Sequence, residues 1–260
     1  MKRLLEIERL SLRFGGITAL EDVSFAIERG RIAALIGPNG AGKTSLFNCV
    51  TGFYRPSAGV IRLHGPNGPR ELQAMAQTEI AAQARLARSF QNIRLFGAMS
   101  CLENLLVAQY RRSAPGVLPS LLGLARAKAA ERAAVEVARE LLVRFDLLEF
   151  ADNEARTLPY GAQRRLEIAR ALATDPMLLC LDEPAAGLNE HESAELAERL
   201  ERLRVEGLSL FLIEHDMGLV MRIADQVIVL DQGRKIADGT PDQVKRDQRV
   251  IAAYLGEEAA

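Results

Sequence analysis

Four short apolar runs stand out along the chain, and each is typical of a strand buried inside a sheet. They are RIAALIG at 31–37, MLLCLDE at 177–183, LSLFLIEHD at 208–216 and QVIVLDQG at 226–233. These runs are too short for buried helices, and helical patterns separate three of them, so crossover connections in a parallel sheet are the simplest interpretation. In such a sheet the chemistry gathers at the carboxyl ends of the strands. The pattern predicts an α/β core.

Partial alternation of apolar and polar residues marks a second kind of strand. It covers 4–14 and 19–30, which are punctuated by Gly15-Gly16 and Gly30, and it returns in GVIRLHG at 59–65. Alternation interrupted by glycine predicts antiparallel strands joined by a short loop. We expect these strands to form a small β-layer beside the parallel sheet.

A helical lobe is expected in the middle of the chain. Between about 92 and 170 the composition shifts toward Ala, Leu, Glu and Arg with helical spacing, as in 124–148. Ser100 with Glu103 matches a capping box and predicts a helix start. Thr240 followed by Pro241 predicts another, which opens a C-terminal tail. The expected domains are an α/β core with its β-layer at 1–91 and 171–239, an inserted helical lobe at 92–170, and a helical tail at 240–260.

Composition and charge limit the classes of protein that remain. The chain has 260 residues, of which 48% are apolar, and a formal net charge of −1. This length can bury one large core with a smaller lobe. No run of lysine or arginine stands out, so we expect no nucleic-acid partner.

The cysteines indicate a reducing compartment, and the lengths of the apolar segments indicate a soluble protein. Cys49, Cys101 and Cys180 are widely spaced among apolar neighbours, which suits buried thiols in a reducing compartment better than a disulfide framework or a zinc site. The N-terminal MKRLLEIERLSLRF returns to charge every few residues and lacks the apolar stretch of a secretory signal. The other apolar runs are far shorter than the ~20 residues that span a bilayer. We expect a soluble protein.

The segment GPNGAGKTS carries a phosphate-binding motif directly after the first apolar run. Gly37, Gly42, Lys43 and Thr44 match the pattern G-x4-G-K-[ST]. The glycines let backbone N–H groups converge on phosphate oxygens, Lys43 supplies a charge, and the Thr44 hydroxyl can coordinate Mg²⁺. An ordinary glycine-rich turn is the alternative, but a chance match has a probability on the order of one per cent. The residues predicted to bind nucleotide here are Gly37, Pro38, Asn39, Gly40, Ala41, Gly42, Lys43, Thr44 and Ser45.

Two adjacent carboxylates end the second apolar run, in LLCLDEP at 178–184. Successive residues at a strand end point in different directions, so Asp182 can hold Mg²⁺ while Glu183 orients water for attack on a γ-phosphate. The alternative is a solvated acidic turn. His215 follows the third run in FLIEHD, where a lone histidine is more often structural than catalytic.

These motifs together resemble the ATP-binding cassette (ABC) ATPase family. The P-loop, LDEPAAGLN (181–189), EHD (214–216) and a helix-starting YGAQRRLEIARAL (160–172) occur in the family's order and approximate spacing. The resemblance covers essentially the whole chain. It implies a P-loop NTPase (RecA-like) parallel sheet core with an antiparallel β-layer and an inserted α-helical lobe. Within the family, ARSFQNIRLF (87–96), LPYGAQRRLEIARAL, DEPAAGLN, IEHDMGLVMRIAD and YLGEE look most like the ATPase subunits of branched-chain amino acid importers.

The resemblance implies roles that spacing alone does not assign. Gln91 falls at the family's Q-loop, where an amide reaches the Mg²⁺ and the attacking water. His215 takes the position of the switch histidine, which donates a hydrogen bond to the γ-phosphate. Phe14 takes the place of the aromatic that stacks on adenine, although without the resemblance it would be interpreted as core. The implied catalytic residues are Glu183, His215 and Gln91, and the implied Mg²⁺ ligands are Thr44, Gln91 and Asp182.

The resemblance also implies that ATP joins two subunits. Residues 158–162 match the family's signature turn, which faces the γ-phosphate held by the P-loop of a second cassette. Tyr160 and Gly161 are the residues expected to bind there, through backbone N–H groups and the helix-end potential. Pro159 stands where the family usually has a serine, Ala162 replaces a polar residue, and Asn189 stands where many members have an aspartate. These departures leave open whether both sites of the pair run at the same rate.

The implied protein is an ATP-hydrolysing motor subunit, peripheral on the cytoplasmic face of the cell membrane, with ATP and Mg²⁺ as cofactors. ATP closes the cassette pair and hydrolysis releases it. The implied partners are a second ATPase subunit, identical or different, integral permease subunits and, indirectly, a solute-binding protein. Arg94, Leu95 and Phe96, with the apolar GVLPSLLGL at 116–124, are candidates for the permease contact. Lobe core is an equally weighted interpretation of the apolar segment.

Other classes fit the sequence less well. A chromosome-maintenance ATPase of this type needs a long heptad insertion, which the residues between Gln91 and Thr157 do not provide. A translation factor normally carries two cassettes, and a small-molecule kinase shares the P-loop but not the YGAQRR helix or the paired carboxylates. The closer alternatives are the ATPase subunits of urea or amide import and of lipopolysaccharide export. The transported molecule touches the permease and a binding protein, so its identity is not written in this chain.

Overall fold

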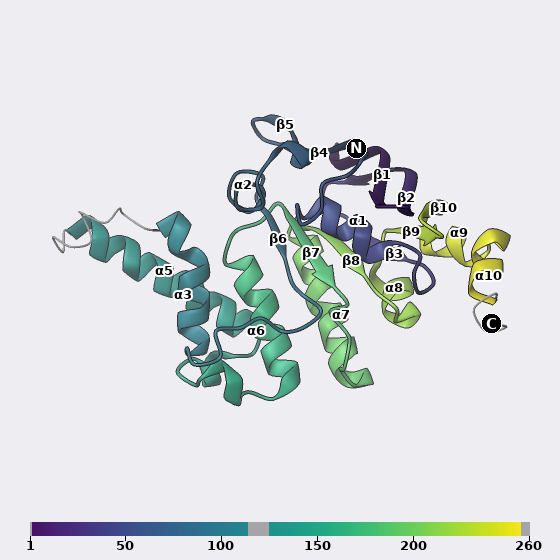
Figure 1. The fold of residues 1–260 in the computed structure, drawn as a ribbon. Coiled ribbons are helices and arrows are strands. Elements are labelled where there is room, and N and C mark those ends of the chain that lie inside the picture. The colour runs from purple at the N-terminus through teal and green to yellow at the C-terminus, as the bar shows by residue number, and fades with distance from the viewer. Residues whose placement is uncertain (1, 114–124, 256–260) are drawn as a thin grey trace. The chain divides into compact units, whose positions relative to one another are not determined.

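The computed structural model describes residues 2–113 and 125–255, and these divide into two compact units (Figure 1). Described residues within Met1–Arg88 and Met177–Ala260 form the first unit, and those within Ser89–Pro176 form the second. The domain bounds expected from the sequence stay a prediction. The apolar segment 116–124, a candidate permease contact, lies outside the described residues.

The strands of the first unit are β1 (Arg3–Phe14), β2 (Ile17–Glu28), β3 (Ile32–Ile36), β4 (Ala58–Gly65), β5 (Gly68–Glu71), β6 (Leu86–Arg88), β7 (Leu178–Asp182), β8 (Ser209–Ile213), β9 (Gln226–Asp231) and β10 (Arg234–Gly239). Its helices are α1 (Lys43–Val50), α2 (Gln77–Gln83), α7 (Glu190–Val205), α8 (Met217–Ile223), α9 (Pro241–Lys245), α10 (Gln248–Leu255) and the short 3-10 turn Leu72–Ala74. The second unit contains α3 (Cys101–Ser113), α5 (Ala125–Arg144), α6 (Tyr160–Leu172) and two 3-10 turns, Leu148–Phe150 and Ala155–Thr157.

The four apolar runs form neighbouring parallel strands, as the sequence predicts. In the described residues the larger sheet has the order β10-β9-β3-β8-β7-β6, with β3 parallel to both β8 and β9 and with β7 parallel to β8. Every residue of β3, β7 and β8 is buried, because helices or the second sheet cover both faces. Apolar residues on both faces of such a strand stabilise the fold, because both faces are shielded from water.

Two strands of this sheet are missed by the sequence pattern. β6 has only three residues and pairs in parallel with β7, and β10 is a partly exposed antiparallel edge strand beside β9. Segments so short or so polar show no periodicity of their own, so only their pairing defines them as strands.

The alternating segments form the predicted antiparallel layer. Its order is β2-β1-β4-β5, and β1 and β2 make a hairpin in which Phe14 pairs with Ile17 across the Gly15-Gly16 turn. One core joins this layer to the larger sheet: Leu5 and Ile61 from the layer pack in the same cluster as Phe47 from α1 and Phe211 from β8. Helix α1 therefore lies buried between the two sheets, which places its first turn at the end of β3 (Figure 1).

Both predicted helix starts are confirmed. The Ser100 N–H donates to Glu103 at 2.8 Å and the Glu103 N–H donates to the Ser100 hydroxyl at 3.1 Å, which is a complete capping box at the start of α3. Thr240 caps α9 in the same way with Gln243, and Pro241 occupies the first turn, where its missing N–H costs nothing. Capping boxes can be identified in the sequence because the two partners lie only three residues apart.

The three cysteines are buried and unpaired, as predicted. Burial raises the pKa of the Cys49 thiol to about 12 and that of Cys101 to about 11, and it also raises the pKa of Cys180. We therefore expect all three to react with iodoacetamide at pH 8 at least ~100-fold more slowly than a free thiol, because only the thiolate attacks. Counting alkylated cysteines by mass spectrometry checks this, with guanidinium-unfolded protein as the control. One cysteine that labels at the unfolded rate in native protein contradicts it.

No helix in the described part of the chain is both long and apolar enough to cross a bilayer.

Candidate nucleotide site

Three adjacent strands of the larger sheet end at or just before the residues that are predicted to bind nucleotide or to catalyse its hydrolysis. β3 ends at Ile36, one residue before the P-loop; β8 ends at Ile213, just before Glu214 and His215; and β7 ends at Asp182. Because β3, β8 and β7 are parallel neighbours, their carboxyl ends lie at one edge of the sheet. The fold thus gathers the P-loop, the carboxylate pair and His215, which are far apart in the sequence.

The P-loop backbone is shaped so that only glycine fits at its critical positions. Gly37 has φ 149°, and a Cβ there would lie 2.1 Å from the carbonyl oxygen of Leu230. Gly42, the residue before α1, has φ 96°, and its Cβ would lie 2.7 Å from the carbonyl oxygen of Ala19. The first turn of α1 contains no acidic residue, and no side chain caps it. Its N–H groups suit an anion, as a phosphate cradle requires.

Lys43 is buried with its ammonium group folded back onto the loop. The residue is only 6% exposed, and Nζ donates to the carbonyl oxygens of Gly37 at 2.6 Å and Pro38 at 2.8 Å. Thr44 is exposed and Ser45 is half-buried, while Asn39 and Gly40 are exposed at the loop's tip. The charge therefore lies under a loop whose outer side is open to a ligand.

Asp182 is engaged by a residue that sequence reasoning missed. Nη2 of Arg88 on β6 lies 2.7 Å from Oδ2 of Asp182, and both side chains are almost fully buried. Nη1 of Arg88 donates to Asn48 at 2.6 Å and to Thr51 at 2.8 Å, both in or just after α1. The guanidinium also lies 4.8 Å and 4.9 Å from the ring centroids of Phe47 and Phe53. Arg88 therefore fixes the end of β7 relative to the helix that follows the P-loop.

Glu183 and His215 are in direct contact. His215 Nε2 lies 3.1 Å from Glu183 Oε1, across the ends of β7 and β8. Glu183 has the left-handed φ of 47°, unusual for a residue with a side chain, and its N–H still donates to Ile213 at 2.9 Å. The backbone thus turns away immediately after the last ladder bond, which turns the Glu183 side chain out of the sheet. The contact joins two of the three residues that are predicted to be catalytic.

Glu214 is a buried carboxylate that the sequence interpretation did not single out. It accepts hydrogen bonds from the N–H groups of Ala185 at 2.8 Å, His215 at 3.1 Å and Asp216 at 3.5 Å. Burial raises the pKa of its carboxyl, and the three N–H donors oppose that rise. Only the IEHD spacing hinted at it, because acceptors for loop N–H groups leave no periodic signal.

Phe14 is half-exposed at the end of β1, so it is not a core residue. Its ring meets Tyr54 edge to face, with centroids 5.2 Å apart and planes at 78°. Tyr54 follows α1, and its N–H donates to Asn48 at 3.1 Å. An exposed aromatic whose orientation is fixed by a second ring can offer a stacking surface to a base, which is compatible with the role that the resemblance implies for Phe14.

Gln91 lies in the second unit, in a segment held by α6. Arg164 of α6 is 1% exposed and donates to the carbonyl oxygens of Phe90 at 2.8 Å and Gln91 at 3.0 Å. Glu167, one turn later, pairs with Arg164 at 3.0 Å and accepts from the N–H groups of Phe90 and Arg94. Arg164, the first of the two arginines after the YGAQ segment, therefore points inward and binds the backbone of the segment predicted to be the Q-loop. Sequence reasoning missed this pair because its contacts are more than seventy residues away.

The segment predicted to be the signature turn opens α6 without a side-chain cap. Pro159 precedes the helix, Tyr160 is exposed as its first residue, and Gly161 and Ala162 are buried in the first turn. Asn189 has a defined local role in the first unit: it caps α7 and forms a capping box with Glu192. Aspartate caps a helix about as well, so this departure from the family pattern is neutral for α7 itself.

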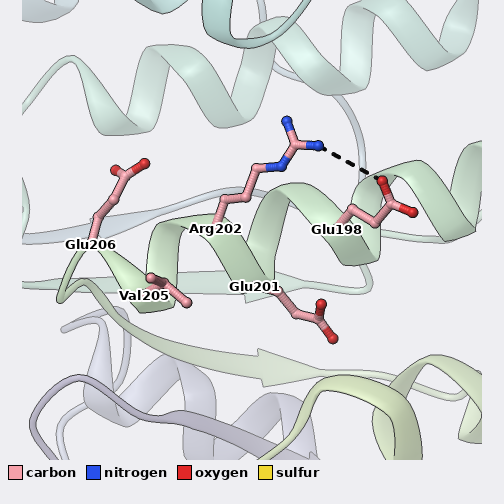
Figure 2. Close-up of a pocket in the computed structure, with 5 residues that line it drawn as sticks. All are labelled: Glu198, Glu201, Arg202, Val205 and Glu206. Atoms are coloured by element: carbon pink, nitrogen blue, oxygen red, sulfur yellow. Dashed lines mark ion pairs between the residues drawn. The ribbon is translucent and has the colours of Figure 1, made fainter.

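A pocket on α7 is not part of this site. It has a volume of about 410 Å³ and is lined by Glu198, Glu201, Arg202, Val205 and Glu206 (Figure 2). These residues come from the C-terminal half of α7 and the residue after it, and none of them is predicted to bind nucleotide. The acidic lining is unsuited to triphosphate.

The sequence, the sheet topology and the P-loop geometry define an ATP-binding cassette, and the chain belongs to the ABC transporter family: the family model described as "ABC transporter" matches residues 20–186. A second model, "Branched-chain amino acid ATP-binding cassette transporter", matches residues 234–260. This confirms the family that the sequence motifs indicate and the predicted fold class.

Named relatives are similar over nearly the full length. The chain is 48% identical over 255 residues to the high-affinity branched-chain amino acid transport ATP-binding protein BraF of Pseudomonas aeruginosa, covering 98% of both chains. It is 46% identical to the corresponding protein LivG of Escherichia coli, again over 98% of both. Among solved structures, the ADP conformation of MJ1267, an ATP-binding cassette of an ABC transporter, is similar with a TM-score of 0.83 and 28% identity, covering 98% of this chain and 100% of that one.

Proposed function

We propose that this chain hydrolyses ATP as the motor subunit of an importer for branched-chain amino acids, peripheral on the cytoplasmic face of the membrane. The observation that carries the ATPase is the contact of 3.1 Å between Glu183 and His215 at strand ends beside the P-loop. Similarity to BraF and LivG supports the substrate class, because both names specify branched-chain amino acid transport.

Asp182 at the end of β7 and Thr44 in the first turn of α1 carry the oxygen atoms that Mg²⁺ needs. A hard cation prefers oxygen ligands, and the carboxylate of Asp182 and the hydroxyl of Thr44 would hold it. The resemblance adds the amide of Gln91, which belongs to the second unit, and this assignment stays a prediction. Bound together with the nucleotide, Mg²⁺ would neutralise charge on the phosphates.

Glu183 and His215 have different roles in the hydrolysis step. The carboxylate of Glu183 orients the attacking water and accepts its proton, and His215 donates a hydrogen bond to the γ-phosphate. Their contact at 3.1 Å supports this division of roles, because both groups would then act on the same phosphate. Lys43 and the loop N–H groups bind the phosphates, and Phe14 stacks on the adenine.

A second cassette completes the site in this proposal. The start of α6, with Tyr160 and Gly161, would bind the γ-phosphate held by the partner, through backbone N–H groups and the positive end of the helix. Pro159 contributes neither a hydroxyl nor an N–H, so Gly161 and its neighbours would supply the donors. ATP then stabilises the closed pair by the difference in its affinity for the two states.

Transport by the reconstituted complex tests the substrate class. The chain is purified with the membrane proteins that accompany it and inserted into vesicles, and ATP-dependent uptake of labelled leucine is compared with uptake of labelled urea. We expect ATP-dependent leucine uptake that a complex carrying Glu183→Gln does not support. Urea uptake, or no membrane protein bound to the chain, contradicts the importer assignment.

A further inference from the structure

Glu214 joins the two turns that carry the proposed catalytic residues. It lies between the end of β8 and His215, and its side chain reaches across to the turn after β7. The residue is 3% exposed, and its two carboxylate oxygens accept from Ala185 on one turn and from His215 and Asp216 on the other. One buried side chain therefore connects backbone on both sides.

The sheet itself cannot make this connection. The last ladder pair of β7 and β8 joins Asp182 to Ile213, and the Glu183 N–H makes the final bond to Ile213. With φ at 47°, Glu183 takes the chain out of the strand direction. The N–H groups of Ala185 and His215 lie beyond that point, and the Glu214 carboxylate accepts from both.

The contact between Glu183 and His215 depends on how these two turns are aligned. Each residue is attached to a turn rather than to a strand, and the distance of 3.1 Å between Nε2 and Oε1 leaves little room for displacement. Given the ATPase function proposed above, we propose that Glu214 is a positioning residue that holds His215 in register with Glu183. It acts through the backbone N–H groups of the two turns and not on the reacting atoms themselves.

Replacing Glu214 with Gln tests this role with little change in shape. The amide keeps one oxygen but turns an NH₂ group toward backbone donors, so one set of bonds is lost. We expect kcat for ATP to fall ~10-fold to 100-fold, since displacements of about 1 Å have such effects. The affinity for a fluorescent ATP analogue should stay within about 2-fold, because the P-loop is untouched.

Histidine NMR gives a readout that is independent of ATPase activity. The chain has three histidines, His64, His191 and His215, so their ring signals are readily assigned. In nucleotide-free protein, Glu214→Gln should shift the ring signals of His215 and leave those of His64 and His191 unchanged. This experiment still decides the role of Glu214 if the chain proves not to hydrolyse ATP.

Asp225→Asn is the matched control. Asp225 is another carboxylate of the first unit that accepts from the backbone, but it is only half-buried: it accepts from the Ile32 N–H at 2.9 Å at the amino end of β3 and pairs with Arg31 and Arg204. We expect this variant to lower stability without moving the His215 signals. The inference is overturned if folded Glu214→Gln keeps wild-type His215 signals and kcat, or if Asp225→Asn reproduces its changes.

Hydrogen exchange covers the case in which Glu214→Gln does not fold. In wild-type protein, the Ala185 amide should exchange far more slowly than an unstructured amide, because it is bonded to a buried carboxylate. Exchange of Ala185 at the free rate overturns the proposal.

Discussion

Glu183→Gln should lower the rate of ATP hydrolysis by ~100-fold or more while ATP binding is retained. A positioned general base contributes about 10²- to 10⁴-fold to a rate, and the neutral amide cannot accept the proton of the attacking water. The substitution keeps the size of the side chain, and the amide can still face His215 at the position where the two side chains now lie 3.1 Å apart. The substitution therefore removes the proposed general base with little change in structure.

The same variant should accumulate as an ATP-bound pair, because hydrolysis is the step that releases the closed state in the proposed cycle. Phosphate release measures the rate, and size-exclusion chromatography with and without ATP measures the pair. Glu198→Gln is the control, since it makes the same change on an exposed side chain of α7 in the same unit. Turnover of Glu183→Gln near the wild-type rate would show that another group is the base.

Lys43→Met should weaken ATP binding by about 10-fold to 100-fold. Hydrogen bonds to charged groups contribute about 1.5–3 kcal/mol each, and methionine keeps most of the buried volume while removing the ammonium group. In the structure this group bonds to two carbonyl oxygens of its own loop, so it is already held beneath the place where phosphates would bind. The loss should appear in the dissociation constant as well as in turnover.

Titration with a fluorescent ATP analogue measures this effect, and thermal unfolding shows whether the variant is folded. Lys235→Met is the matched control, because Lys235 lies on β10 in the same unit and forms a local ion pair with Asp238, three residues away. A dissociation constant for Lys43→Met within about 3-fold of wild type would contradict the predicted role.

Much of the candidate site could be predicted from the sequence because the residues of each motif are adjacent along the chain. The P-loop from 37 to 45 and the Asp182-Glu183 pair each need only a strand end and a few following residues, so short-range spacing reveals them. Gln91, His215 and Phe14 stand alone in the sequence, and only the resemblance to a family assigned their roles. The structure adds the contact between His215 and Glu183.

Three supporting groups could not be predicted in this way. Arg88 meets Asp182 across 94 residues, Glu214 meets Ala185 across 29, and Arg164 meets Phe90 across 74. Arginine and glutamate are usually solvated, so the sequence alone predicts that each of these residues is a surface charge. Their burial is a property of the packing around them.

The sequence by itself determined the buried strands, the hairpin, the helix caps and the phosphate loop, because each depends on the periodicity or on partners a few residues apart. Only the tertiary structure decided that β3, β8 and β7 are neighbours and that the three-residue β6 joins the sheet. It also decided that Arg88 and Glu214 hold segments of the first unit, and that the Arg164–Glu167 pair holds the segment around Gln91 within the second unit. The physical reason is that hydrogen bonds and ion pairs between distant segments require a specific approach of backbone and side chain, which no local pattern encodes.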